Sequence, residues 1–147
     1  MIKKIVFSIS LFAIFSAFAQ AADMSSPVGI WQTISDQTKQ PSSLVKISKA
    51  NGVLIGEVLQ LLPGSQQQES ALCFDCPEGF KNKPIIGLHF LWDFVPDQKS
   101  SWKNGKILDP LSGHIYKGTL KLVDQGRKME LRGYWGPFWR TQTWLRA

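Results

Sequence analysis

Histidine and cysteine, the side chains that most often bind zinc, are nearly absent from this sequence. It contains two histidines, His89 and His114, and two cysteines, Cys73 and Cys76. A structural zinc site takes four ligands of these types, and the two histidines lie far apart along the chain. The sequence therefore predicts no metal site.

The sequence also lacks the short motifs of the common catalytic and cofactor sites. It has no Gly-x-Ser-x-Gly nucleophile elbow, no phosphate-binding loop and no dinucleotide fingerprint. Ser112 and His114 beside Asp109 suggest a hydrolase, but these residue types are equally those of a tight turn. We interpret them as a turn, and we predict a protein that is not an enzyme and has no cofactor.

Runs of like charge are absent as well. The formal net charge is +6, but the lysines and arginines are dispersed along the chain. Binding to nucleic acid phosphates favours a clustered basic stripe. The composition therefore predicts no nucleic acid partner, and it is compatible with weak contact to anionic components of a cell envelope.

Only one long apolar run occurs, and it lies at the N-terminus. Lys3 and Lys4 precede apolar residues 5–18, and small residues follow in Ala17-Phe18-Ala19 and Ala19-Gln20-Ala21. This order is typical of a cleavable signal peptide, and the run is shorter than the roughly 20 residues of a membrane span. We predict a signal peptide at 1–21 and one mature domain at 22–147, with no transmembrane span, in the periplasm or secreted. Cleavage removes both lysines and lowers the formal charge from +6 to +4.

The two cysteines stand in the sequence Cys-Phe-Asp-Cys-Pro, within a polar segment at 63–83 that is rich in Gly, Pro and Gln. Three interpretations compete for this pair: a structural disulfide, a thioredoxin-like redox pair and a zinc site. Export to an oxidising compartment favours disulfide formation. A redox pair requires a helix start in a βαβ setting, which the surrounding prolines and glycines do not suggest. We predict a Cys73–Cys76 disulfide that pins part of this long loop.

Short segments that alternate apolar and polar residues make up most of the mature chain, with no long helical pattern. Asn51-Gly52 is a strong hairpin signal. Asn104-Gly105 predicts a second tight turn within 102–109, and residues 109–113 predict a turn in which Gly113 tolerates positive φ. The expected strands are 28–35, 44–48, 53–62, 114–123, 129–132 and 138–146. Apolar residues 84–95 predict a strand or a short helix, and 102–109 is the segment that contains the second turn. Regular turn spacing of this kind predicts an all-β fold, and we favour a single antiparallel up-and-down β-barrel of about eight strands.

Several ordered motifs resemble a known family. They are Gly29-Ile30-Trp31, NGVLIGEVLQLL at 51–62, CFDC, KNKPIIGLHFLWDF at 81–94, WKNGKILDPLSGHIY at 102–116, MELRGY at 129–134 and RTQTWLR at 140–146. Together they cover nearly the whole mature chain, and they resemble the bacterial domain-of-unknown-function family 2147 of small secreted proteins. This resemblance implies an exported, lipocalin-like domain and supplies no catalytic residues.

A second likeness concerns the Gly-x-Trp at Gly29 and Trp31, which is similar to the lipocalin signature. In that superfamily the tryptophan closes one end of the barrel beneath an arginine of the last strand. Arg140 and Arg146 are both candidates for this arginine, through stacking of the guanidinium on the indole.

Aromatic residues are the most prominent feature of the composition, with six tryptophans and a dense group near the C-terminus. Most of them are expected to pack the core, but a barrel of about eight strands can also enclose one small molecule. The predicted ligand-binding residues are Trp31, Tyr116, Arg132, Trp135, Trp139, Gln142 and Trp144. Strand alternation places Arg140, Gln142, Trp144 and Arg146 on one face of the last strand, without deciding which face is inside.

These patterns lead to two functional hypotheses. The first is an exported, non-enzymatic, lipocalin-like protein that binds a small apolar or amphipathic ligand. The alternative is an envelope-associated interaction protein that acts through its basic and aromatic surface.

Overall fold

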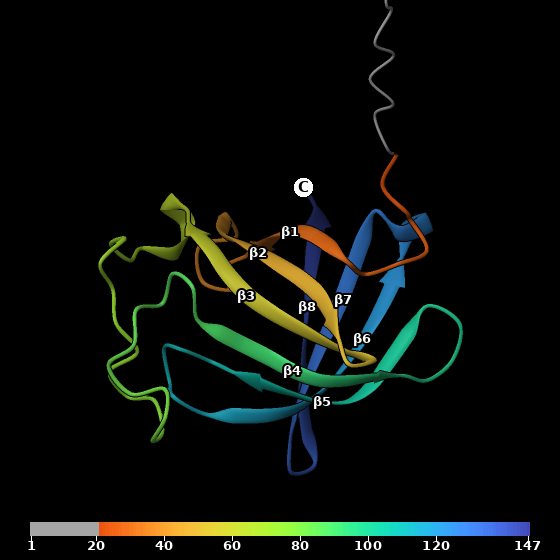
Figure 1. The fold of residues 1–147 in the computed structure, drawn as a ribbon. Coiled ribbons are helices and arrows are strands. Elements are labelled where there is room, and N and C mark those ends of the chain that lie inside the picture. The colour runs from red at the N-terminus through yellow and green to blue at the C-terminus, as the bar shows by residue number, and fades with distance from the viewer. Residues whose placement is uncertain (1–20) are drawn as a thin grey trace, which may run out of the picture.

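The computed structural model describes residues 21–147, so the predicted signal peptide lies almost entirely outside the described residues. Eight strands follow one another, with two short 3-10 turns between them (Figure 1). The elements are β1 (Gly29–Ile34), β2 (Pro41–Ala50), β3 (Val53–Leu61), η1 (Pro63–Ser65), β4 (His89–Pro96), β5 (Ser101–Leu108), β6 (Ile115–Val123), η2 (Asp124–Gly126), β7 (Lys128–Trp135) and β8 (Phe138–Arg146).

Each strand pairs antiparallel with the next one along the chain, and β8 returns to β1 through Trp31 opposite Arg146 and Gln32 opposite Leu145. The result is a closed up-and-down barrel, and the sequence prediction of this fold is confirmed. Within the described residues each strand therefore has a neighbour on both sides, although β1 and β8 share only these two residue pairs. The segment at 84–95, for which the sequence left strand and short helix open, overlaps β4 and forms a strand there.

Side-chain alternation along the strands builds the core. In β6, Gly118, Leu120 and Leu122 are buried while Lys117 and Lys121 face solvent. The same period of two recurs around the barrel because successive side chains of a strand point to opposite faces. The largest fully buried side chains are Trp31, Val45, Ile47, Cys73, Leu91, Phe94, Leu108, Leu120, Met129 and Trp144.

The first hairpin turn is confirmed, since Asn51 and Gly52 have φ values of 51° and 81° and join β2 to β3. The second predicted turn is wrong: Asn104 and Gly105 lie inside β5. Here Asn104 has φ 59° and the pairing with β6 shifts register, which marks a bulge. A Cβ at position 105 would overlap the Phe94 ring. This Asn-Gly pair therefore forms a β-bulge, and its glycine leaves room for the Phe94 ring in the core. The chain turns instead at 97–100.

The long segment between β3 and β4 is held by local bonds. Cys73 and Cys76 form the predicted disulfide. Backbone hydrogen bonds between Cys73 and Lys83, and between Asn82 and Cys73, close the base of this loop. Both sulfur atoms lie 3.9 Å from the Pro110 carbonyl oxygen, so the loop packs against the turn that joins β5 to β6.

That β5–β6 turn has the predicted chemistry. Gly113 has φ 74°, and a Cβ there would overlap the backbone of Asp75 in the disulfide loop. The Asp109 carboxylate accepts a hydrogen bond from the Leu111 N–H at 2.9 Å. Glycine is required at this position both by backbone conformation and by the close contact.

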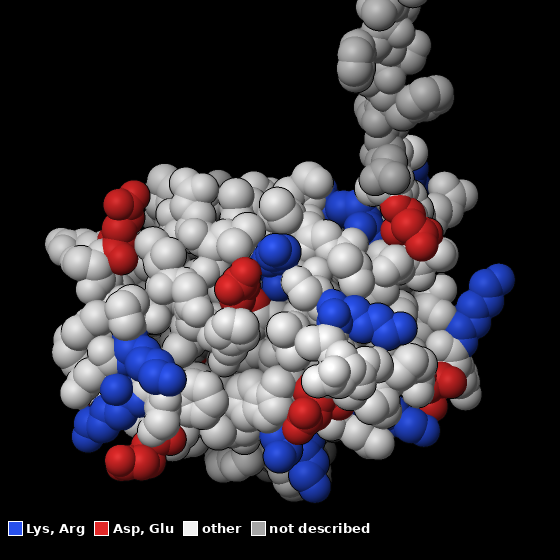
Figure 2. Space-filling model, in the orientation of Figure 1, with Lys and Arg blue, Asp and Glu red and all other residues white. Residues whose placement is uncertain are grey.

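Charges of both signs are dispersed over the face seen in Figure 2. This agrees with the scattered basic residues of the sequence. Within residues 21–147, no helix has the length and apolar character needed to cross a bilayer.

Candidate ligand cavity

One end of the barrel is closed by Trp31 and Arg146. The Trp31 side chain is fully buried and its indole N–H donates to the Pro27 carbonyl at 2.8 Å. The Arg146 guanidinium lies 4.3 Å from the Trp31 ring, with Nε donating to the Gly126 carbonyl and Nη2 to the Ser26 carbonyl, each at 2.8 Å. Burial lowers the pKa of Arg146 below its ordinary value, partly offset by the nearby Asp23 charge. Of the two candidate arginines, Arg146 therefore caps the tryptophan.

The same contact accounts for the glycine two residues before Trp31. Gly29 has φ 143°, and a Cβ there would lie 3.3 Å from Nη1 of Arg146. A side chain would therefore be strained by the backbone and would crowd the capping guanidinium. The Gly-x-Trp pattern and the last-strand arginine thus form one unit at the closed end.

The opposite half of the barrel contains a cavity of about 670 Å³. This lies within the range of about 300–1,000 Å³ that is typical of small-molecule sites. Its inner wall is formed by buried apolar side chains from strands around the barrel and from the segment before β4. These are Val45, Val58, Ile85, Phe90, Leu108, Leu131 and Trp144.

The wall is partly aromatic. The rings of Phe90 and Trp144 lie 6.0 Å apart in a tilted arrangement. The Trp144 indole N–H donates to Oε1 of Gln142 at 3.3 Å, so its polar edge is satisfied by a side chain of the same strand face. The inner wall therefore offers apolar surface without an unpaired indole donor.

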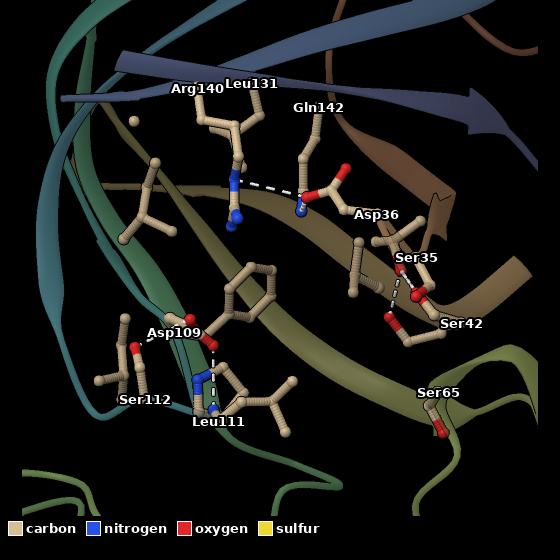
Figure 3. Close-up of a pocket in the computed structure, with 18 of the residues that line it drawn as sticks. Ser35, Asp36, Ser42, Ser65, Asp109, Leu111, Ser112, Leu131, Arg140 and Gln142 are labelled. Atoms are coloured by element: carbon tan, nitrogen blue, oxygen red, sulfur yellow. Dashed lines mark hydrogen bonds and ion pairs between the residues drawn. The ribbon is translucent and has the colours of Figure 1, made fainter. Parts of the chain in front are cut away.

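A polar cluster stands above this wall. The Asp36 carboxylate, in the loop after β1, accepts a hydrogen bond from Nε2 of Gln142 at 3.0 Å and forms an ion pair with Nε of Arg140 at 3.4 Å. Figure 3 shows these three side chains close together on one side of the cavity, with Arg140 and Gln142 from β8 and Asp36 from the segment after the neighbouring β1. Because the Arg140 contact uses Nε, the two terminal nitrogens of its guanidinium have no partner among residues 21–147 and can meet a ligand group.

Hydroxyl groups extend the polar surface along β1 and β2. The Thr33 hydroxyl is hydrogen-bonded to those of Ser42 at 2.7 Å and Ser43 at 2.6 Å. All three residues line the cavity. A hydroxyl can both donate and accept, so this group can adapt to either kind of ligand atom.

The structure brings five of the seven predicted ligand-binding residues to this cavity: Tyr116, Trp135, Trp139, Gln142 and Trp144. The other two lie elsewhere. Trp31 is at the closed end. Arg132 faces outward, where its Nε donates to the Thr141 hydroxyl at 3.0 Å and its guanidinium lies 6.0 Å from the Trp139 ring.

Strand alternation explains the position of Arg132. Leu131 and Gly133 of β7 line the cavity, so the intervening Arg132 must point away from it. On β8 the inner face carries Arg140, Gln142 and Trp144, which answers the question that the sequence left open.

The sequence analysis did not identify Asp36 or the three hydroxyl residues Thr33, Ser42 and Ser43 as lining residues. Thr33 lies two residues beyond Trp31 on β1, so strand alternation places Thr33 and Trp31 on the same inner face. This alternation could have identified Thr33. No local signal identifies Asp36, because its partners Arg140 and Gln142 lie more than one hundred residues away in the sequence.

The residues that suggested a hydrolase form a turn. The Ser112 hydroxyl donates to Asp109 at 2.9 Å and accepts from the backbone N–H of His114 at 3.3 Å. The His114 ring instead packs edge-on against Tyr116. Among the described residues no group of three or more His, Cys, Asp or Glu side chains is placed to hold a metal ion.

Comparisons with known proteins agree with this architecture. Residues 29–146 match the profile of a family described as uncharacterised protein conserved in bacteria (DUF2147). A solved structure of HP1028 from Helicobacter pylori, described as belonging to the lipocalin family, superimposes with a TM-score of 0.70 and 25% identity. The match covers 82% of each chain. The search of curated proteins finds no match.

Proposed function

Because the chain belongs to the bacterial DUF2147 family and folds as a lipocalin-like barrel, we propose that it is an exported, non-enzymatic binding protein for a small amphipathic ligand. The observation that supports this most directly is the cavity of about 670 Å³ inside the barrel, with its apolar inner wall and its polar cluster at Asp36, Arg140 and Gln142.

The division of the cavity indicates how such a ligand lies. Its apolar part packs against Phe90, Leu131 and Trp144, and burial there contributes roughly 25 cal/mol for each Å² removed from water. Its polar end meets Arg140 and the hydroxyl group of β1 and β2. A ligand that lacked a polar end would leave this cluster partly desolvated, which costs free energy.

The non-enzymatic assignment is supported by the chemistry of the lining. It supplies apolar surface and hydrogen-bonding groups, and neither histidine of the chain belongs to it. The candidate nucleophile Ser112 does border the cavity, but its hydroxyl is engaged in the turn with Asp109.

Gly133 offers a direct test of the cavity. It lies on the inner face of β7, and a Cβ there would make only ordinary contact, at 3.6 Å from Tyr116. We expect Gly133→Leu to fill part of the cavity and to weaken binding of the probe anilinonaphthalene sulfonate at least tenfold, an effect of about 1.4 kcal/mol. The matched control is Arg132→Leu, which puts the same side chain on the outer face one residue away.

Fluorescence titration of both variants, with circular dichroism to verify folding, measures the difference. Equal probe affinity in the two variants would exclude the cavity as the binding site. Competition between the probe and a medium-chain fatty acid then tests the ligand class. The fatty acid is amphipathic, and its anionic end is expected to bind Arg140.

Export is tested separately. The disulfide and the fold are compatible with a protein outside the cytoplasm. We expect the mature protein recovered from the periplasmic or secreted fraction to begin after Ala19 or Ala21 when its N-terminus is sequenced. An intact N-terminus in the cytoplasmic fraction would contradict this part of the proposal.

A further inference from the structure

The hairpin that joins β7 to β8 carries four large side chains in solvent. Tyr134 is 36% exposed, Trp135 73%, Phe138 67% and Trp139 63%. Figure 1 shows this hairpin projecting beyond the body of the barrel. We call these four residues and the intervening Gly136-Pro137 the aromatic tip. A contiguous group of large exposed apolar side chains usually marks a site of interaction with another molecule or a membrane.

The aromatic tip is held by its strands. Tyr134 pairs with Trp139 and Trp135 pairs with Phe138 in the β7–β8 ladder, and Gly136 takes φ 55° in the turn. The rings are therefore presented by paired strands and a tight turn, so little backbone entropy remains to be lost when they are buried.

Basic side chains surround the base of the aromatic tip. Lys117 of β6 pairs opposite Tyr134, Arg132 lies against the Trp139 ring, and Arg140 follows Trp139 on β8. Arg140 is paired with Asp36, while among the described residues neither Lys117 nor Arg132 forms an ion pair. The long β3–β4 loop lies on another side of the barrel (Figure 1).

We propose that the aromatic tip inserts into the interfacial region of an anionic phospholipid bilayer. Tryptophan and tyrosine favour that region because their rings are apolar at one end and polar at the other. Lys117 and Arg132 at the base would then lie at the level of the headgroups, where basic residues are attracted to anionic lipid.

The dimensions fit this arrangement. From Gly133 and Arg140 to the turn the hairpin extends about three residues per strand, or about 10 Å at the usual rise of a β-strand. Interfacial segments bury their apolar faces about 5–10 Å into the boundary between headgroups and acyl chains. A convex tip of four side chains is small for a stable protein interface, which buries about 1,200 Å² or more in total.

Docking through the aromatic tip has a geometric consequence. Trp135 and Phe138 also line the cavity. A bilayer that receives the tip therefore lies beside the entrance to the ligand cavity, so an amphipathic molecule has a short path between lipid and protein. The membrane contact itself does not depend on ligand binding.

Co-sedimentation with vesicles tests the proposal. We expect the wild-type mature protein to bind vesicles of equimolar phosphatidylglycerol and phosphatidylcholine at low salt, and more weakly to phosphatidylcholine alone. Trp135→Ser/Phe138→Ser should reduce binding to the anionic vesicles at least tenfold. The control is Phe74→Ser, which removes a side chain of similar exposure, 64%, from the disulfide loop and should leave binding unchanged.

Two further variants separate the contributions. Lys117→Gln/Arg132→Gln should weaken binding to anionic vesicles about tenfold and leave binding to phosphatidylcholine vesicles nearly unchanged. Gly133→Leu should retain vesicle binding while losing the cavity probe, so failure of the ligand proposal and failure of this one are distinguishable.

Several results would overturn the proposal. They are vesicle binding that survives Trp135→Ser/Phe138→Ser, equal loss of binding in Phe74→Ser, and no binding of the wild type at low salt. A dimer of the wild type in analytical ultracentrifugation that the double variant abolishes would also reject it, because a second copy of the chain would then cover the tip.

Discussion

Replacing Arg146 by methionine should destabilise the barrel through its closed end. Methionine keeps an unbranched apolar stem over the Trp31 ring but removes the guanidinium plane. The lost interactions are the stacking at 4.3 Å and two hydrogen bonds at 2.8 Å to the carbonyls of Gly126 and Ser26. These bonds tie β8 to the β6–β7 turn and to the segment before β1.

The expected cost follows from these contacts. Cation–π stacking of the partly exposed Arg146 guanidinium on the buried Trp31 ring contributes about 1 kcal/mol. Hydrogen bonds from a charged donor are strong when they are buried. Arg146 is partly exposed, and in the variant water can bond to the two carbonyls in its place. Each of the two hydrogen bonds therefore contributes about 1 kcal/mol. Arg146→Met should therefore lower the free energy of unfolding by about 3 kcal/mol, which corresponds to a fall in melting temperature of roughly 10 °C for a domain of this size.

Urea unfolding followed by tryptophan fluorescence measures this change. Arg146→Lys keeps the charge but lacks the planar fork that reaches both carbonyls, and should recover less than half of the loss. Arg127→Met is the control, because Arg127 forms an exposed ion pair with Asp124 in the adjacent turn, and exposed pairs contribute little to stability. The reasoning is refuted if Arg146→Met costs no more than this control.

Three other predictions follow from single contacts. Gly105→Ala should destabilise by about 1–3 kcal/mol in urea unfolding, because its methyl group would overlap the Phe94 ring; an unchanged midpoint would show that the bulge relaxes freely. Cys73→Ser should cost about 2 kcal/mol, since the disulfide closes a loop of only a few residues, and a loss above about 4 kcal/mol would show that it supports more than this loop. The pKa of Asp124 lies below its ordinary value because its carboxylate accepts a hydrogen bond from Arg127. The Asp124–Arg127 contact therefore stabilises the folded protein at pH values above the pKa of Asp124 in the unfolded chain. This stabilisation is lost as the pH falls through the lower pKa of the folded state. Arg127→Ala should raise the Asp124 midpoint measured by NMR, and an unmoved midpoint would assign the shift to another cause.

The local sequence was sufficient for the overall architecture. Alternation in segments such as 114–123 and the Asn51-Gly52 hairpin depend on neighbours within a few residues, and so does the Gly-x-Trp at the start of β1. These signals predicted an antiparallel barrel of about eight strands and the turn at Gly113. The cysteine spacing, read with the export signal, predicted the disulfide.

The meaning of Asn104-Gly105 could not be settled locally. The same dipeptide makes a hairpin turn at 51–52 and a bulge within β5, and the difference comes from Phe94 on the neighbouring strand, whose ring takes the space that a side chain at position 105 would fill. A local pattern reports which backbone conformations are permitted, while a packing partner on another strand selects among them.

The candidate site was only partly predictable for the same reason. The sequence by itself determined that β8 has two faces and that Arg140, Gln142, Trp144 and Arg146 share one of them. Only closure of the barrel decided that Gln142 and Trp144 face inward, that Arg146 and not Arg140 caps Trp31, and that Asp36 meets Arg140 and Gln142 from the other end of the chain. The period of a strand is a property of its own backbone, but its register and its inner face are set by pairing with strands that lie far away in the sequence.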